Sequence, residues 1–131
     1  MTPPLGPSAR PTRFGVSAWI YGDAPLDETL ARIKAAGYDG VELPGEPGRW
    51  APAELGRALR RHGLIPVALT ASCMVPETRH DLAHPDPAVR AEAVRYVVDC
   101  LRLAAEIGAP LVQMLASGET RLAPITTRDE E

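Results

Sequence analysis

The segment GYDGV at residues 37–41 contains the pattern that decides the fold of this 131-residue chain. A helical stretch ends at its first glycine, and a valine four residues later begins a short apolar strand. The same spacing recurs from Gly63 to Val67 and from Gly108 to Val112. Glycine suits the position just past a helix, because the backbone there usually takes a positive φ that penalises a Cβ atom. Each of these glycines therefore predicts the end of a helix.

Amphipathic segments precede all three glycines. Apolar side chains recur in them at three- and four-residue intervals, which is the spacing of one helix face. Asp86 is a favourable N-cap for the longest segment, and Pro87 suits its first turn. The predicted helices are residues 26–36, 52–62 and 87–107.

Short β-rich runs alternate with these helices, at Phe14–Ile20, Gly40–Leu43, Ile65–Thr70 and Leu111–Leu115. Strands that alternate with helices pair in parallel through right-handed crossovers, since a tight hairpin cannot connect parallel neighbours. We expect an α/β fold whose parallel (β/α) units form the N-terminal half of a TIM barrel, about four strands and three helices. The barrel is favoured over a dinucleotide-binding or P-loop sheet, because the glycine-rich fingerprints of those folds do not follow any predicted strand.

The chain divides into three predicted parts. Residues 14–117 form the partial barrel domain. Residues 1–13 include four prolines and no apolar stretch, so they are expected to be a disordered lead and not a signal peptide. Residues 118–131 are expected to be a loop followed by the start of a fourth helix, or a tail.

Composition argues against several classes of function. With 14 basic and 17 acidic side chains the formal charge is −3, which offers no general attraction for nucleic acid. No apolar run approaches the roughly 18–20 residues that cross a membrane. These features predict a cytoplasmic protein that binds neither nucleic acid nor a membrane.

Alternation along the strands selects the side chains that face the barrel interior. If the valine that begins each strand faces the helices, the next residue faces inward. This rule predicts an inward face of Ser17, Glu42, Ala68 and Gln113, with Trp19 and Thr70 one step nearer the C-terminal mouth. A carboxylate is costly to bury unless it is paired or lies at a wet site. Glu42 is therefore the leading candidate for a catalytic residue or substrate contact, the alternative being a strand-end glutamate that meets solvent or an arginine.

Five residues form the predicted substrate-binding set: Trp19, Tyr21, Thr70, His80 and Gln113. Gln113 suits a hydrogen bond to a substrate hydroxyl or to a backbone group, and the two aromatic residues suit either a pocket wall or ordinary packing. His80 lies in the long loop after the third predicted strand, on the side where barrels build their active sites.

The segments AAGYDGVEL (35–43), PDPAVR (85–90) and LAAEIGA (103–109) resemble those of xylose isomerase-like TIM barrels. These are the sugar phosphate isomerases and epimerases, which include ketose epimerases, hydroxypyruvate isomerases and inosose dehydratases. The resemblance implies an enzyme that uses a divalent metal (Mn, Mg, Zn or Co) and abstracts a proton beside the carbonyl of a sugar or polyol. The family's metal ligands lie on strands five to eight, so the resemblance implies no metal ligand and no cofactor for this chain alone.

Three hypotheses follow for such a half-barrel. The first is a partial copy of a metal-dependent isomerase, epimerase or dehydratase that is inactive alone. The second is a half-barrel completed by a second copy in a homo-oligomer or by a complementary half-barrel, because exposed edge strands favour pairing. The third is a non-catalytic module that binds carbohydrate or regulates another protein.

Overall fold

The computed structural model describes residues 12–71 and 79–116. The elements are β1 (Gly15–Ser17), a 3₁₀ helix η1 (Ala18–Tyr21), α1 (Leu26–Ala35), β2 (Gly40–Pro44), α2 (Pro52–His62), β3 (Ile65–Ala71), α3 (Pro87–Ile107) and β4 (Val112–Met114). The tail predicted at 118–131, nearly all of the lead predicted at 1–13, and residues 72–78 of the long loop lie outside the described residues.

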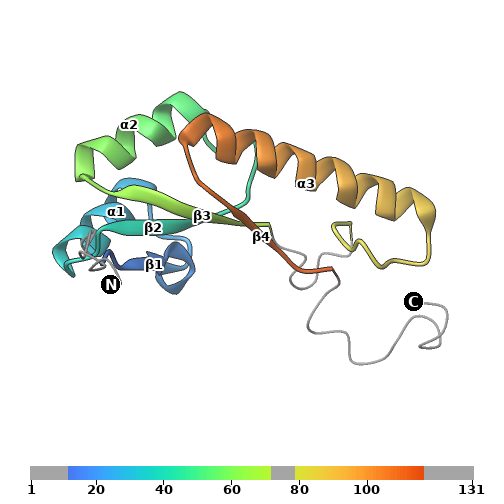
Figure 1. Ribbon diagram of the computed structural model, residues 1–131, viewed down its shortest axis with the longest axis horizontal. Coiled ribbons are helices and arrows are strands. Elements are labelled where there is room, and N and C mark those ends of the chain that lie inside the picture. Colours follow the sequence, from blue (N-terminus) through green and yellow to red (C-terminus); the bar gives the residue numbers. More distant parts are fainter. Residues whose placement is uncertain (1–11, 72–78, 117–131) are drawn as a thin grey trace, which may run out of the picture.

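The four strands form one parallel sheet in the order β1-β2-β3-β4, which confirms the predicted α/β half-barrel. Figure 1 shows α3 lying along the sheet, with its N-terminal half extending past the tips of β2 and β3. One apolar cluster joins all three helices to the sheet, so the helices cover the same face. Its buried members include Leu30 and Ile33 of α1, Leu43 of β2, Leu55 of α2 and Leu103 of α3.

The helices end where local chemistry predicts. Gly37, Gly63 and Gly108 have φ values of 89°, 62° and 78°, in the left-handed region that favours glycine. At the start of α3, the Asp86 carboxylate accepts a hydrogen bond from the Ala88 N–H at 2.8 Å and caps the helix. The three predicted helices are therefore confirmed, with α1 one residue shorter than expected.

The first strand is shorter than predicted. The range Phe14–Ile20 was wrong, because the strand ends at Ser17 and the next four residues form η1. The Ser17 hydroxyl accepts a hydrogen bond from the Trp19 N–H at 3.4 Å, which stabilises a tight turn in place of extended backbone. Trp19 therefore lies on a helical turn that follows β1.

The predicted alternation is wrong at Val67, which faces the interior of the sheet instead of the helices. Its methyl groups lie 3.1 Å and 2.5 Å from the points where a Cβ on Gly15 and on Gly40 would stand. Gly40 is two residues before Glu42 and so shares its face. A β-bulge is the cause, because the pairing of β2 with β3 shifts just before Glu42 and leaves β3 with an extra residue. Ala68 then aligns with Glu42.

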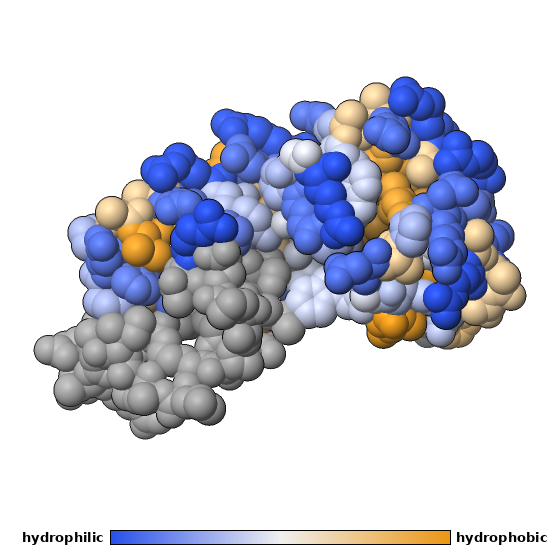
Figure 2. Space-filling model, turned by 180° about the vertical axis from the view of Figure 1, so that it is seen from behind, coloured by the Kyte–Doolittle hydropathy of each residue, from blue (hydrophilic) through white to orange (hydrophobic). Residues whose placement is uncertain are grey.

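Exposed apolar side chains lie near both outer strands and along α3. The most exposed are Phe14, Ile20, Val94, Leu101, Leu111 and Met114. Seen from behind in Figure 2, the surface is largely hydrophilic and its apolar residues form small separate patches. In the part of the chain that the structure describes, no helix combines the length and apolar character needed to cross a membrane.

An ion-pair cluster joins α1 to α2. The Asp27 carboxylate bonds His62 at 2.8 Å and Arg61 at 2.5 Å, both in the last turn of α2. The hydrogen bond with His62, and after it the one from Arg61, holds the pKa of Asp27 below its usual value. The ionised carboxylate therefore helps to hold the two helices together.

Asp27→Asn is expected to make folding less sensitive to acid. Because the pKa of Asp27 is lower in the folded than in the unfolded chain, its carboxylate stabilises the fold above the unfolded pKa. That stabilisation is lost as the pH falls below about 4 and passes through the folded pKa. Urea unfolding at about pH 7 and about pH 2.5 should show a smaller loss of stability for Asp27→Asn than for the wild type. Glu28→Gln on the same turn is the control, and equal losses in wild type and Asp27→Asn would contradict the prediction.

Candidate functional site

A carboxylate and two hydroxyls meet on the inward face of the sheet. Glu42 in β2 accepts hydrogen bonds from Ser17 Oγ in β1 at 3.0 Å and from Thr70 Oγ1 in β3 at 2.6 Å. Both donors bond the same oxygen, Oε1. These distances are typical of hydroxyl-to-carboxylate bonds. Three neighbouring strands thus orient one carboxylate.

The second carboxylate oxygen of Glu42 is accessible. Within the described residues Oε2 accepts no hydrogen bond, and no buried side-chain oxygen or nitrogen there lacks a partner. Oε2 is therefore not buried. Gln113 of β4 aligns with Thr70 in the sheet and is exposed, so it adds a fourth polar residue from a fourth strand. We call Ser17, Glu42, Thr70 and Gln113 the polar row.

A cavity of about 620 Å³ opens at the C-terminal end of the sheet. Its walls include Trp19, Gly45, Glu46, His80, Glu92 and Tyr96, from η1, the turn after β2, the loop before α3 and the N-terminal half of α3. Pro44 also lines it, two residues after Glu42 and on the same face of β2. This mouth cavity therefore adjoins the polar row, and its volume lies in the range of small-molecule sites.

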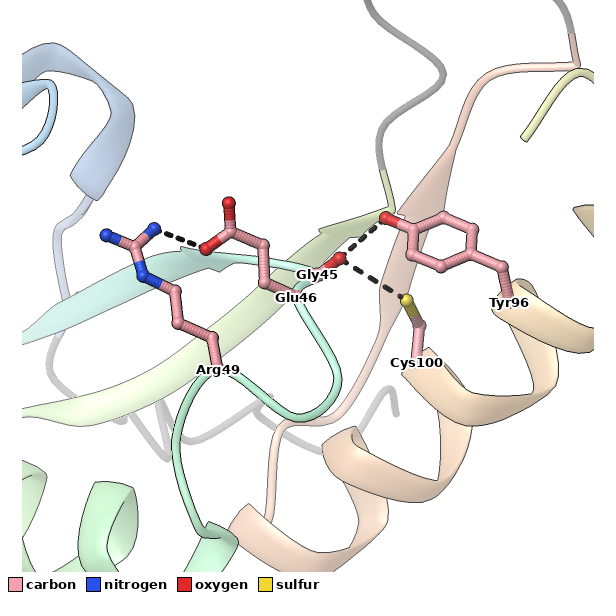
Figure 3. Close-up of polar contacts among 5 residues, drawn as sticks. All are labelled: Gly45, Glu46, Arg49, Tyr96 and Cys100. Carbon is pink, nitrogen blue, oxygen red and sulfur yellow. Dashed lines mark hydrogen bonds and ion pairs between the residues drawn. The ribbon is translucent and has the colours of Figure 1, made fainter. Parts of the chain in front are cut away.

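Side chains of α3 position the turn after β2. The Tyr96 hydroxyl donates to the Gly45 carbonyl at 2.6 Å, and Cys100 Sγ donates to the same oxygen at 3.7 Å (Figure 3). His80 stacks on the Tyr96 ring, with centroids 3.5 Å apart and planes inclined by 3°. Burial raises the pKa of the Cys100 thiol, which keeps it protonated and able to donate at neutral pH. The turn, α3 and the preceding loop thus form one wall of the mouth cavity.

The structure places four of the five predicted substrate-binding residues in these two features. Thr70 and Gln113 belong to the polar row, and Trp19 and His80 line the mouth cavity. Tyr21 lies in neither, because it packs against the core with the Arg32 guanidinium 4.9 Å from its ring centroid.

The residues that α3 contributes to the mouth cavity were missed in the sequence. Glu92, Tyr96 and Asp99 line it and follow one another at four- and three-residue intervals, so they share one face of the helix. This stripe, with a tyrosine among carboxylates, was the signal that could have found them. The direction in which this face of α3 points depends on how the helix docks against the turn after β2.

The described residues do not fit a metal ion. Across residues 12–71 and 79–116, no three histidine, cysteine, aspartate or glutamate side chains come together to bind one. The divalent metal that the resemblance implies therefore has no ligand set among them.

Solved structures of sugar epimerases share this fold. L-ribulose 3-epimerase matches with a TM-score of 0.72 and 23% identity, over 90% of this chain and 40% of that one. The 3-keto-D-glucoside 4-epimerase of E. coli matches at 0.69 and 20% identity, over 88% and 44%. The D-allulose 3-epimerase of Methylomonas sp., in complex with D-allulose, matches at 0.69 and 18% identity, over 92% and 43%. The chain thus spans less than half the length of these enzymes.

Sequence comparison identifies the family. No curated protein matches the chain. Residues 30–131, most of the chain, match the family described as xylose isomerase-like TIM barrel, and the resemblance of the three segments is confirmed. The protein belongs to the xylose isomerase-like TIM barrel family.

Proposed function

We propose that the chain binds a sugar or related polyol at the polar row, as part of a sugar isomerase or epimerase. The orientation of the Glu42 carboxylate carries this proposal, because two hydroxyls bond Oε1 while Oε2 is accessible. An accessible carboxylate oxygen suits a hydrogen bond from a sugar hydroxyl or the transfer of a proton beside a carbonyl. Membership of the family, and the fold shared with ketose epimerases, support a polyhydroxy-carbonyl substrate.

In this proposal each residue has a distinct role. Ser17 and Thr70 are positioning residues that keep the Glu42 carboxylate from rotating. Gln113, whose amide both donates and accepts, contacts a second hydroxyl of the sugar. Trp19, which is 38% exposed, offers an apolar surface to the C–H face of the sugar.

Proton exchange tests whether the chain catalyses a reaction by itself. An isomerase or epimerase of this type removes a proton beside the carbonyl, so that proton should exchange with solvent. NMR of D-fructose with the protein and Mn²⁺ in D₂O measures the exchange. Exchange above a control that contains Mn²⁺ but no protein supports an enzyme, whereas binding without exchange fits both the binding module and a partial copy that is inactive alone.

Glu42→Gln is expected to weaken binding of D-fructose by about tenfold, because it removes a charge-assisted hydrogen bond to the sugar. The fold should survive, since the glutamine oxygen still accepts from Ser17 and Thr70. Titration calorimetry measures the affinity, and thermal unfolding followed by circular dichroism reports the fold. Glu54→Gln, the same change at an exposed position of α2, is the matched control. Unchanged affinity in Glu42→Gln, or no sugar binding by the wild type, would refute the proposed role.

A further inference from the structure

A second cavity, of about 190 Å³, lies beside the mouth cavity and has no part in the proposed function. Leu43 lines it and directly follows Glu42 in β2, so it faces away from the polar row. Thr29 of α1 lines it as well. Three residues line both cavities: Trp19, Pro44 and Glu46. We call this second space, on the helix side of the sheet, the side cavity.

The side cavity is apolar inside and charged at its rim. Its apolar lining includes Ala18, Leu26, Leu43 and Trp50, which all belong to the core cluster or pack against it. Its charged residues, Asp23, Glu46 and Arg49, are exposed, so they lie at the rim. Glu46 and Arg49 pair with each other (Figure 3). Because transfer of a charged ligand from water to an apolar interior is unfavourable, the lining favours a neutral compound.

Thr29 contributes a hydroxyl to the side cavity. The residue is 5% exposed, and its Oγ1 makes no hydrogen bond with another described group. Since no buried side-chain oxygen or nitrogen among the described residues lacks a partner, Oγ1 is not fully buried. Thr29 lines the side cavity, so its hydroxyl reaches that space. An unpaired hydroxyl in an apolar wall is a position where a ligand can form a hydrogen bond.

We infer that the side cavity is a second binding site, which takes a small neutral aromatic compound with one hydroxyl, a phenol. A cavity of about 150 Å³ holds one benzene molecule, so about 190 Å³ holds such a ring together with a hydroxyl. The ring lies against the indoles of Trp19 and Trp50 in offset or edge-to-face contact. Its hydroxyl bonds Thr29 Oγ1, which both donates and accepts. The site is separate from the polar row, so the inference does not depend on sugar binding.

Titration with phenol, followed by NMR of the tryptophan indole N–H signals, tests the inference. The chain has two tryptophans and both line the side cavity, whereas only Trp19 lines the mouth cavity. Both signals are expected to shift together and to saturate with a dissociation constant on the order of 1 mM, as suits a ligand with so few atoms. A shift of the Trp19 signal alone would place phenol in the mouth cavity and overturn the inference, and so would the absence of any saturable shift.

Two substitutions test the position of the phenol. Thr29→Val keeps the shape of the side chain and removes its hydroxyl, so it should weaken phenol binding about fivefold. Binding of toluene, which has the same shape as phenol without the hydroxyl, should not change in this variant. Ala24→Leu places a larger side chain in the side cavity and should abolish the binding of both compounds. Ala53→Leu, the same change at an exposed position of α2 outside the side cavity, is the matched control.

Two results with these variants would contradict the inference. Equal affinity of the wild type and Thr29→Val for phenol would overturn the role of the hydroxyl, and with it the class of ligand. Equal effects of Ala24→Leu and Ala53→Leu would show that phenol binds elsewhere. Circular dichroism checks that each variant folds. If Ala24→Leu does not fold, Ala24→Val should weaken the binding of both compounds by a smaller factor.

Discussion

Leu43→Ala is expected to lower the free energy of unfolding by about 2–5 kcal/mol, the range typical of a buried leucine whose cavity does not collapse. Leu43 is 0% exposed and lies in the cluster that joins the sheet to all three helices. It also directly follows Glu42 in β2, on the opposite face. A loss of this size is a large share of the stability of a small domain, so sugar binding should fall with the folded fraction. Urea unfolding measures both the midpoint and the free energy.

Leu101→Ala provides the matched comparison. Leu101 is 52% exposed on α3, so its truncation should change the free energy of unfolding by no more than about 0.5 kcal/mol. Similar losses for the two variants would mean that the cluster around Leu43 does not form the core described for this fold.

Gly45→Ala is expected to destabilise the fold by about 1–3 kcal/mol and to disturb the mouth cavity. An added Cβ would stand 2.9 Å from the Thr70 carbonyl oxygen and 3.0 Å from Cys100 Sγ, with the Ala71 Cα at 3.1 Å. Two of these three atoms belong to the backbone of β3, so they cannot move aside as the end of a flexible side chain can. The turn after β2 must shift instead, which would weaken the hydrogen bond from Tyr96. Urea unfolding and titration with D-fructose should both register the change.

Gly56→Ala is the control for this substitution. Gly56 lies inside α2, where an added Cβ would meet only the mobile end of Arg60 at 3.3 Å. Alanine has the higher helix propensity, so this variant should gain about 0.5–1 kcal/mol. A Gly45→Ala variant as stable as the wild type would contradict the prediction, because it would mean that the turn is not packed tightly against β3 and α3.

Local chemistry explains which parts of the fold were predictable. The bounds of α3 follow from Asp86 at its N-cap, Pro87 in its first turn and Gly108 just past its end, all of which act within a few residues. The end of β1 was missed because the Ser17 side chain competes for the backbone of Trp19, and an apolar run alone does not reveal that competition. The direction of Val67 was missed because a β-bulge depends on the pairing of two strands.

The candidate site likewise combines residues that local patterns predict with residues that only long-range packing places. Period-two alternation placed Ser17 and Glu42 on the inward face, which the structure confirms by their hydrogen bond. Their contact with Thr70 requires the register between β2 and β3, which no single segment encodes. The contribution of Glu92 and Tyr96 to the mouth cavity depends on the docking of α3 against the turn after β2. Such long-range placement is set by packing and cannot be read from periodicity.

The hydrogen bond from Tyr96 to Gly45 joins residues that are 51 positions apart, so it bears on the order of events in folding. Closing so long a loop costs more chain entropy than pairing β2 with β3, whose partners are about half as far apart. The two central strands can thus pair first, and α3 completes the cavity wall only when it docks. Partial release of α3 would dismantle a wall of the mouth cavity while the paired strands and their polar row persisted, so the mouth cavity is less stable than the sheet that carries Glu42.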